Sequence, residues 1–135
     1  ALEVPILIIV IGEGASGGAL GIGVGDRIIM LENTWYSVIS PEGCASILYR
    51  DAAKAPQAAE AMKVTAQSVK ELNIADEILP EPNGGAHRSP KETAEIVKRA
   101  ILKHVRKLRT LPKDVLLQQR LEKYSKMGSW EDIGK

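Results

Sequence analysis

The sequence predicts an α/β fold in which strands and helices alternate, and three observations carry this prediction. Residues 4–11 form a continuous apolar, β-branched run, which is typical of a strand covered on both faces. A glycine-rich segment with a short small-residue helix separates this run from a second apolar run at 28–31. Over residues 90–124, apolar residues recur at helical spacing, so two longer helices are expected at that end of the chain.

Local signals place the elements in order. Pro5 lies near the start of the first strand, where its missing N–H matters least. Ser40 and Pro41 have the residue types of an N-cap and a first helical position, and Thr65 is a second candidate cap. The expected elements are strands at 4–11, 28–31, 35–39 and 75–79, and helices at 17–24, 41–49, 51–62 and 65–73. Residues 80–85 are expected to break regular structure.

A capping-box pattern at 89–92 opens the first of the two longer helices. We expect it to end near Thr110, and Pro112 to open the final helix. The predicted inward stripe of the first comprises Ile96, Val97, Ala100, Ile101, Val105 and Leu108. The predicted inward residues of the second are Val115, Leu116, Leu117, Leu121 and Tyr124.

The chain is long enough at 135 residues for one domain with a real core. We expect a core at 1–88, a helical segment at 89–127 for packing or subunit contacts, and a frayed tail at 128–135. Because the sequence starts abruptly on an apolar run, the core is expected to lack earlier strands. Phe is absent, so Ile, Leu, Val and Ala must fill the core.

No run approaches the ~18 apolar residues of a membrane span, which indicates a soluble protein. The single Cys44 excludes an internal disulfide.

The glycine-rich segment at 10–30 is interpreted as an anion-binding turn. Glycine has no Cβ, so Gly12, Gly14, Gly17 and Gly18 can expose backbone N–H groups to another molecule. If a helix begins at 16–18, those N–H groups lie at its positive end and have no intrahelical partner. The segment therefore predicts a site made of backbone donors.

Three motifs carry a resemblance to a known family: GEGASGGALGIGVGDR, SVISPEGCASILYRDAAKAPQAAEAMK and PEPNGGAHR. In this order they resemble the alpha subunit of the multi-subunit acetyl-CoA carboxylase carboxyltransferase, within the crotonase superfamily, over about residues 4–127. Ala15 and Gly21 stand where that family more usually has Gly and Ala. The resemblance implies the C-terminal half of a crotonase-like (ββα)n spiral with two terminal helices.

The resemblance also implies an activity, which is carboxyl transfer from carboxybiotin on a carrier protein to acetyl-CoA, giving malonyl-CoA for fatty acid synthesis. The N–H groups of Gly17 and Gly18 would form the oxyanion hole for the biotin oxygen, and the released biotin nitrogen would accept the proton. Further substrate-binding residues would be Gly14, Ala15 and Ser16. A second group would either form a wall beneath the biotin pocket or simply cap a helix, and it comprises Ser40, Pro41, Glu42 and Gly43.

The implied partners are a carboxyltransferase beta subunit, which would supply the acetyl-CoA site, and the biotin carboxyl carrier protein. An alpha2-beta2 assembly in the bacterial cytoplasm or the plastid stroma would follow, with no metal and no membrane contact in this chain. A zinc ribbon, where the family has one, would belong to the beta subunit. The fragment alone is expected to be inactive.

Other interpretations remain open at this point. Gly12, Gly14 and Gly17 match a dinucleotide-binding fingerprint with Glu32 as the acidic partner, although little room is left for its helix. The glycines could also serve only tight packing. Residues 88–126 hold twelve Lys or Arg and four Asp or Glu, which admits a non-catalytic interaction module or a nucleic-acid-binding module. The apolar stripe and the scarce aromatics favour a solvated face instead.

Several single residues have plainer interpretations. Ser16 is expected to cap its helix and Glu13 to point away from the anion site. Cys44 is interpreted as a buried small hydrophobe. We expect His87, which Arg88 follows, to be a hydrogen-bonded structural residue, and His104 to be interfacial or exposed. The two histidines give no metal-ligand spacing.

Overall fold

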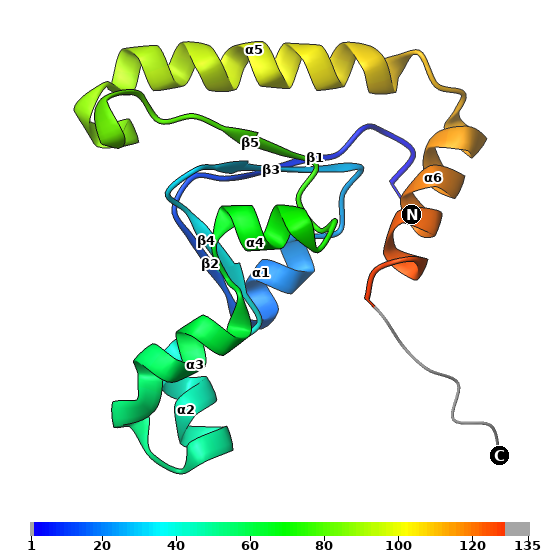
Figure 1. Ribbon diagram of the computed structural model, residues 1–135. Helices are drawn as coiled ribbons and strands as arrows, with labels where there is room; N and C mark the ends of the chain where they lie inside the picture. The colour runs from blue at the N-terminus through cyan, green and yellow to red at the C-terminus, as the bar shows by residue number, and fades with distance from the viewer. Residues whose placement is uncertain (1, 129–135) are drawn as a thin grey trace, which may run out of the picture.

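The computed structural model describes residues 2–128 and contains two separate parallel sheets (Figure 1). The larger sheet has the strand order β1-β3-β5, formed by Leu7–Val10, Arg27–Leu31 and Glu77–Leu79. The smaller sheet pairs β2 (Glu13–Ala15) with β4 (Trp35–Ser37). The α/β class is therefore confirmed, but β2 was not predicted, because it lies inside the segment interpreted as a turn.

In residues 2–128, six α-helices connect and cover the sheets. They are α1 (Ser16–Ile22), α2 (Pro41–Tyr49), α3 (Ala55–Met62), α4 (Ala66–Glu71), α5 (Pro90–Arg109) and α6 (Lys113–Ser125). The described part of the chain also contains three 3₁₀ turns, which are η1 (Ala52–Lys54), η2 (Pro82–Gly84) and η3 (Ala86–Arg88). The helix expected at 51–62 is thus divided into η1 and α3, and the expected loop at 80–85 contains a 3₁₀ turn.

The larger sheet is buried on both faces, as its apolar strands predict. Alternate side chains of β1 and β3, among them Ile8 and Met30, pack toward Ala66 and Val69 of α4. Their neighbours, among them Ile29, pack on the opposite face with the predicted stripe of α5. Figure 1 shows α5 running along one side of this sheet and α4 on the other. The core consists of aliphatic residues, as expected.

A smaller cluster lies between α2 and α3, which extend away from the larger sheet (Figure 1). Cys44, Ala45 and Ala58 are buried there, with Ile39 and Met62 packed against them. Cys44 is therefore the buried small residue that the sequence predicted.

The first strand is shorter than expected, because side chains bind the backbone that precedes it. The carbonyls of Leu2 and Val4 accept hydrogen bonds from the guanidinium of Arg120 in α6, at 2.7 and 2.8 Å. Ile6 N–H donates to the Asp26 carboxylate at 2.7 Å. These groups are satisfied without a neighbouring strand, so sheet pairing begins only at Leu7.

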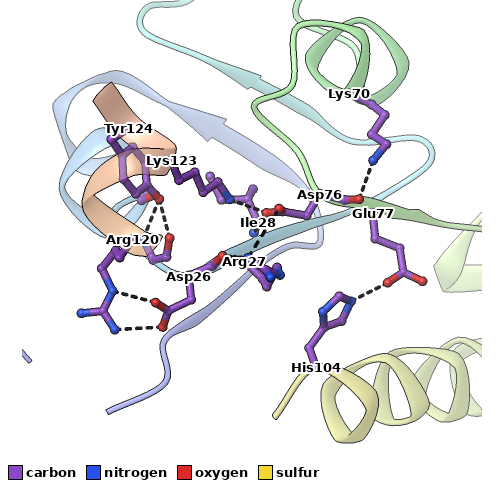
Figure 2. A network of polar contacts seen from close by, with 12 residues as sticks. Asp26, Arg27, Ile28, Lys70, Asp76, Glu77, His104, Arg120, Lys123 and Tyr124 are labelled. Atoms are coloured by element: carbon purple, nitrogen blue, oxygen red, sulfur yellow. Dashed lines mark hydrogen bonds and ion pairs between the residues drawn. The ribbon is translucent and has the colours of Figure 1, made fainter. Parts of the chain in front are cut away.

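The predicted inward face of α6 was wrong at one position. Leu121 is 68% exposed, whereas Arg120 is buried and forms a bidentate ion pair with Asp26, both contacts at 2.9 Å. Figure 2 shows Arg120, Lys123 and Tyr124 of α6 directed at the chain around Asp26 and Asp76. The inward face of α6 therefore includes Arg120 and Lys123, which contact Asp26 and Asp76, and differs from the face that the apolar pattern predicted.

The helix starts were predicted with mixed success. Ser40 is the N-cap of α2 and accepts from Gly43 N–H at 3.2 Å, and Thr65 caps α4 in the same manner. Ser89 occupies the N-cap position of α5 but makes no capping bond with its side chain. Its hydroxyl accepts from the Asn83 side chain at 2.6 Å instead, so the predicted capping box does not form.

Candidate functional site

The glycine-rich segment passes directly from β2 into α1, which begins at Ser16 as predicted. Ala15 is the N-cap, and no side chain caps the helix, so the expected capping role of Ser16 was wrong. Ser16 has φ 68°, in the left-handed region that non-glycine residues seldom adopt. The chain therefore turns sharply at the point where the first N–H groups of α1 begin.

Six of the seven glycines in this segment fall into two groups, whereas Gly25 packs against Ile6 and Ile8. A Cβ placed at Gly17 or Gly18 would meet no atom within 4 Å, and the same holds for Gly12 and Gly21. Both Gly17 and Gly18 are exposed, and their N–H groups have no hydrogen-bond acceptor among residues 2–128. Packing within the described part of the chain therefore does not explain why these two positions are glycine.

The second group is held against the Tyr36 side chain of β4. A Cβ at Gly14 would lie 2.7 Å from its ring, and a Cβ at Gly23 would lie 2.2 Å from its hydroxyl. That hydroxyl donates to the carbonyl of Ala19 in α1 at 2.6 Å. The interpretation of glycine as a packing requirement is thus confirmed for Gly14 and Gly23, whereas no contact within residues 2–128 requires glycine at positions 17 and 18.

A second tyrosine contacts the end of α1. The hydroxyl of Tyr124 accepts from Gly25 N–H at 2.7 Å and lies 2.8 Å from the Gly23 carbonyl. Burial raises the pKa of Tyr36 above 10.0, and burial also raises the pKa of Tyr124. Both phenols therefore stay protonated and able to donate at neutral pH. The sequence placed Tyr36 in a strand and Tyr124 on an inward face, but nothing local indicated these contacts.

Two cavities adjoin this segment. One, of about 370 Å³, has a mostly apolar lining that includes Ser16, Leu20, Tyr36 and Tyr124. The other, of about 300 Å³, is bordered by Gly12, Glu13, Gly14 and Ala19 among others. Gly17 and Gly18 line neither, so their N–H groups lie at an open surface of this chain. Glu13 borders the second cavity, apart from those N–H groups.

The second predicted group, Ser40 to Gly43, forms the first turn of α2. Gly43 N–H is occupied by the Ser40 hydroxyl, and a Cβ at Gly43 would lie 2.9 Å from Ile39. Neither cavity described above is lined by Ser40, Pro41, Glu42 or Gly43. The observed role of these residues is to begin and pack a helix.

Both histidine predictions were wrong. His87 is exposed and makes no hydrogen bond to any residue in 2–128, while the neighbouring Arg88 donates to the Asn83 carbonyl at 3.3 Å. His104 is 8% exposed and its Nε2 contacts the carboxylate of Glu77 in β5. Burial raises the pKa of Glu77, but the hydrogen bonds with His104 and Lys103 outweigh this and leave it lowered. His104 therefore ties α5 to the sheet.

The dinucleotide interpretation does not agree with the geometry. In that fold the glycine turn joins a strand to a long helix, whereas here Gly14 lies in β2 of a separate sheet and α1 has seven residues. Glu32, the proposed ribose ligand, accepts from the N–H of Glu81 at 2.5 Å. The acidic residue is thus bound to a loop of its own chain.

The described residues hold neither a cluster of metal ligands nor a helix suited to spanning a membrane. Within residues 2–128, no three His, Cys, Asp or Glu side chains come together as a metal site would require. None of the helices in that part of the chain combines the length and apolar character needed to cross a bilayer.

Comparisons with known proteins agree with the motifs. Residues 1–128 match the family model described as acetyl co-enzyme A carboxylase carboxyltransferase-like. The alpha subunit of acetyl-coenzyme A carboxylase carboxyl transferase from Synechococcus elongatus is 57% identical over 126 residues, covering 93% of this chain and 38% of the relative. The one from Halalkalibacterium halodurans is 54% identical over 132 residues, covering 98% and 41%. The chain thus spans about two fifths of the length of these relatives.

The fold also has a counterpart among solved structures. A Pseudomonas malonate decarboxylase hetero-tetramer in complex with coenzyme A contains a chain that matches with a TM-score of 0.60, at 23% identity, over 87% of this chain and 45% of that one. At this identity the likeness concerns the fold alone. Sequence motifs, family model and relatives agree, and the chain therefore belongs to the acetyl-CoA carboxylase carboxyltransferase-like family.

Proposed function

We propose that this chain is the carboxybiotin-side part of a carboxyltransferase, which moves a carboxyl group from carboxybiotin to acetyl-CoA and gives malonyl-CoA for fatty acid synthesis. Its relatives at 50–57% identity are named carboxyl transferase subunit alpha, which supports this assignment. The single observation that carries the site is the open surface at Gly17 and Gly18, where backbone N–H groups have no acceptor within residues 2–128.

These donors fit the needs of biotin chemistry. Carboxybiotin, when bound, supplies an activated carboxyl group, and negative charge develops on the ureido oxygen as that group leaves. The N–H groups of Gly17 and Gly18 would donate to this oxygen. Gly14 and Ala15 of β2 lead into Ser16, where the chain turns into α1. Losing one fixed donor of this kind typically costs about 2.7–4 kcal/mol of barrier. The absence of a Cβ at both positions keeps the approach open.

The remainder of the assembly belongs to the same proposal. A beta subunit would supply the acetyl-CoA site, and a biotin carboxyl carrier protein would deliver the tethered biotin, in an alpha2-beta2 complex of the bacterial cytoplasm or plastid stroma. The "subunit alpha" in the relatives' names supports a partner subunit. In the fold, β1-β2-α1 and β3-β4-α2 are two successive strand-strand-helix units, which supports a crotonase-like spiral with α5 and α6 as its terminal helices.

Valine at Gly17 or Gly18 tests the site in the complete assembly. Neither glycine has a positive φ, so an L-residue can adopt its backbone conformation, and nothing within 4 Å would clash with its Cβ. We expect malonyl-CoA formation to fall by about two to three orders of magnitude while the complex still assembles. Gly21→Val is the matched control, because Gly21 is equally open but lies one turn further along α1. Near-normal turnover of Gly17→Val and Gly18→Val would refute the assignment.

A further inference from the structure

Helix α1 needs support from outside itself. It has seven residues, none of them buried, and no side chain caps its start. A helix of this length has little stability of its own in water. The direction of its first N–H groups must therefore be fixed by contacts from other elements.

Tyr36 supplies the first of these contacts. Its ring lies against Gly14 before α1, and its hydroxyl donates to the Ala19 carbonyl within α1 and lies beside Gly23 after it. One side chain of β4 thus touches the segment before, within and after the helix. Replacement of the hydroxyl by hydrogen would remove the bond to Ala19 and leave the ring in place.

Tyr124 supplies the second contact from α6. Its hydroxyl accepts from Gly25 N–H and lies within 2.8 Å of the Gly23 and Gly25 carbonyls, which fixes the residues that follow α1. The neighbouring turn of α6 is itself anchored, because Arg120 pairs with the buried Asp26 and Lys123 pairs with Asp76 (Figure 2). The C-terminal end of α1 is therefore connected to a rigidly held helix.

We propose that Tyr36 and Tyr124 are positioning residues for the transfer reaction, which hold α1 so that the N–H groups of Gly17 and Gly18 keep a fixed direction. The inference rests on the proposed function. Neither hydroxyl touches Gly17 or Gly18, so both tyrosines act through the helix and not on the substrate. In this arrangement α6 organises the site as well as packing against the sheet.

The test compares phenylalanine variants in the full-length chain assembled with its beta subunit. Tyr36→Phe and Tyr124→Phe each remove one hydroxyl. Tyr49→Phe is the matched control, because Tyr49 is 39% exposed and its hydroxyl makes no hydrogen bond within residues 2–128. Glu77→Gln controls for stability, because it weakens the contact with α5 on another side of the sheet.

We expect kcat to fall about tenfold or more in both site variants, with an unchanged KM for acetyl-CoA, since small displacements of catalytic groups are costly. Amide hydrogen exchange at 20–23 should become about tenfold faster, as for the loss of one hydrogen bond. Both controls should retain kcat and the exchange rate of α1.

Two results would overturn the inference: a fall in kcat no larger than that of Glu77→Gln, or unchanged exchange in α1. Gly17→Val, measured alongside, separates this failure from that of the proposed function. An inactive Gly17→Val together with fully active tyrosine variants would refute positioning alone. An active Gly17→Val would refute the donor site, and the positioning role with it.

Discussion

Substitution of Arg120 by alanine should destabilise the fold far more than loss of an exposed ion pair. The guanidinium contacts both oxygens of Asp26 at 2.9 Å and donates to two backbone carbonyls near the start of the chain. The side chains of Arg120 and Asp26 are only 9% and 2% exposed. Alanine would leave the Asp26 carboxylate buried, with the Ile6 N–H as its remaining donor.

The expected cost follows from this burial. Removal of one partner of a buried ion pair typically costs about 3–5 kcal/mol, because the other charge stays in a poorly solvated place. Lys113 and Glu3 form the comparison pair: their N–O distance is 3.1 Å, but their side chains are 74% and 60% exposed. Exposed pairs contribute at most about 1 kcal/mol, so Lys113→Ala should change the free energy of unfolding by less than that.

Urea unfolding of the full chain at pH 7, followed by circular dichroism, measures both variants. The double variant Arg120→Met with Asp26→Asn should recover part of the loss, because it removes both charges and keeps most of the volume. If the cost of Arg120→Ala were within 1 kcal/mol of that of Lys113→Ala, the buried ion pair would not hold α6 as described.

Three further predictions concern glycine, pH and capping. Gly23→Ala should lower the unfolding free energy, because its Cβ would lie 2.2 Å from the Tyr36 hydroxyl. Gly21→Ala, whose Cβ would meet no atom within 4 Å, should raise the unfolding free energy by about 0.5–1 kcal/mol. Thermal denaturation ranks the two variants, and equal effects would contradict the distinction between packed and open glycines. The folded pKa of Glu77 is below its unfolded value of 4.5. The contribution of Glu77 to stability is therefore present above pH 4.5 and is lost as the pH falls through the folded pKa. In a series of urea titrations at different pH values, Glu77→Gln should remove this part of the acid dependence. Ser40→Ala should cost about 1 kcal/mol, because Gly43 N–H loses its acceptor, and no change in urea midpoint would show that the cap contributes nothing.

Local patterns predicted those parts of the fold that depend on neighbouring residues. The apolar stripe of α5 and the cap at Ser40 involve contacts set within a few positions of the chain, and both were found as predicted. The strand β2 could not be predicted, because three residues that include a glycine carry no strand signal and gain their structure from pairing with β4.

Contacts between distant residues account for the remaining errors. Arg120 points inward because it pairs with Asp26, which lies 94 positions earlier in the sequence. His104 points inward toward the carboxylate of Glu77 in β5, which its Nε2 contacts. For the candidate site, the start of α1 was predictable from its glycines. Which glycines pack against Tyr36 and which stay open depends on tertiary structure, which the sequence pattern does not contain.

The bonds of Arg120 also have a consequence for synthesis on the ribosome. Asp26 emerges 94 residues before the guanidinium that neutralises it, and the carbonyl of Leu2 emerges 118 residues before the same partner. Until then the nascent segment must keep these groups hydrated or bound to a chaperone, since burying them unpaired is unfavourable. Translation has to pass Arg120 before Asp26 and the backbone preceding β1 can reach their final environment.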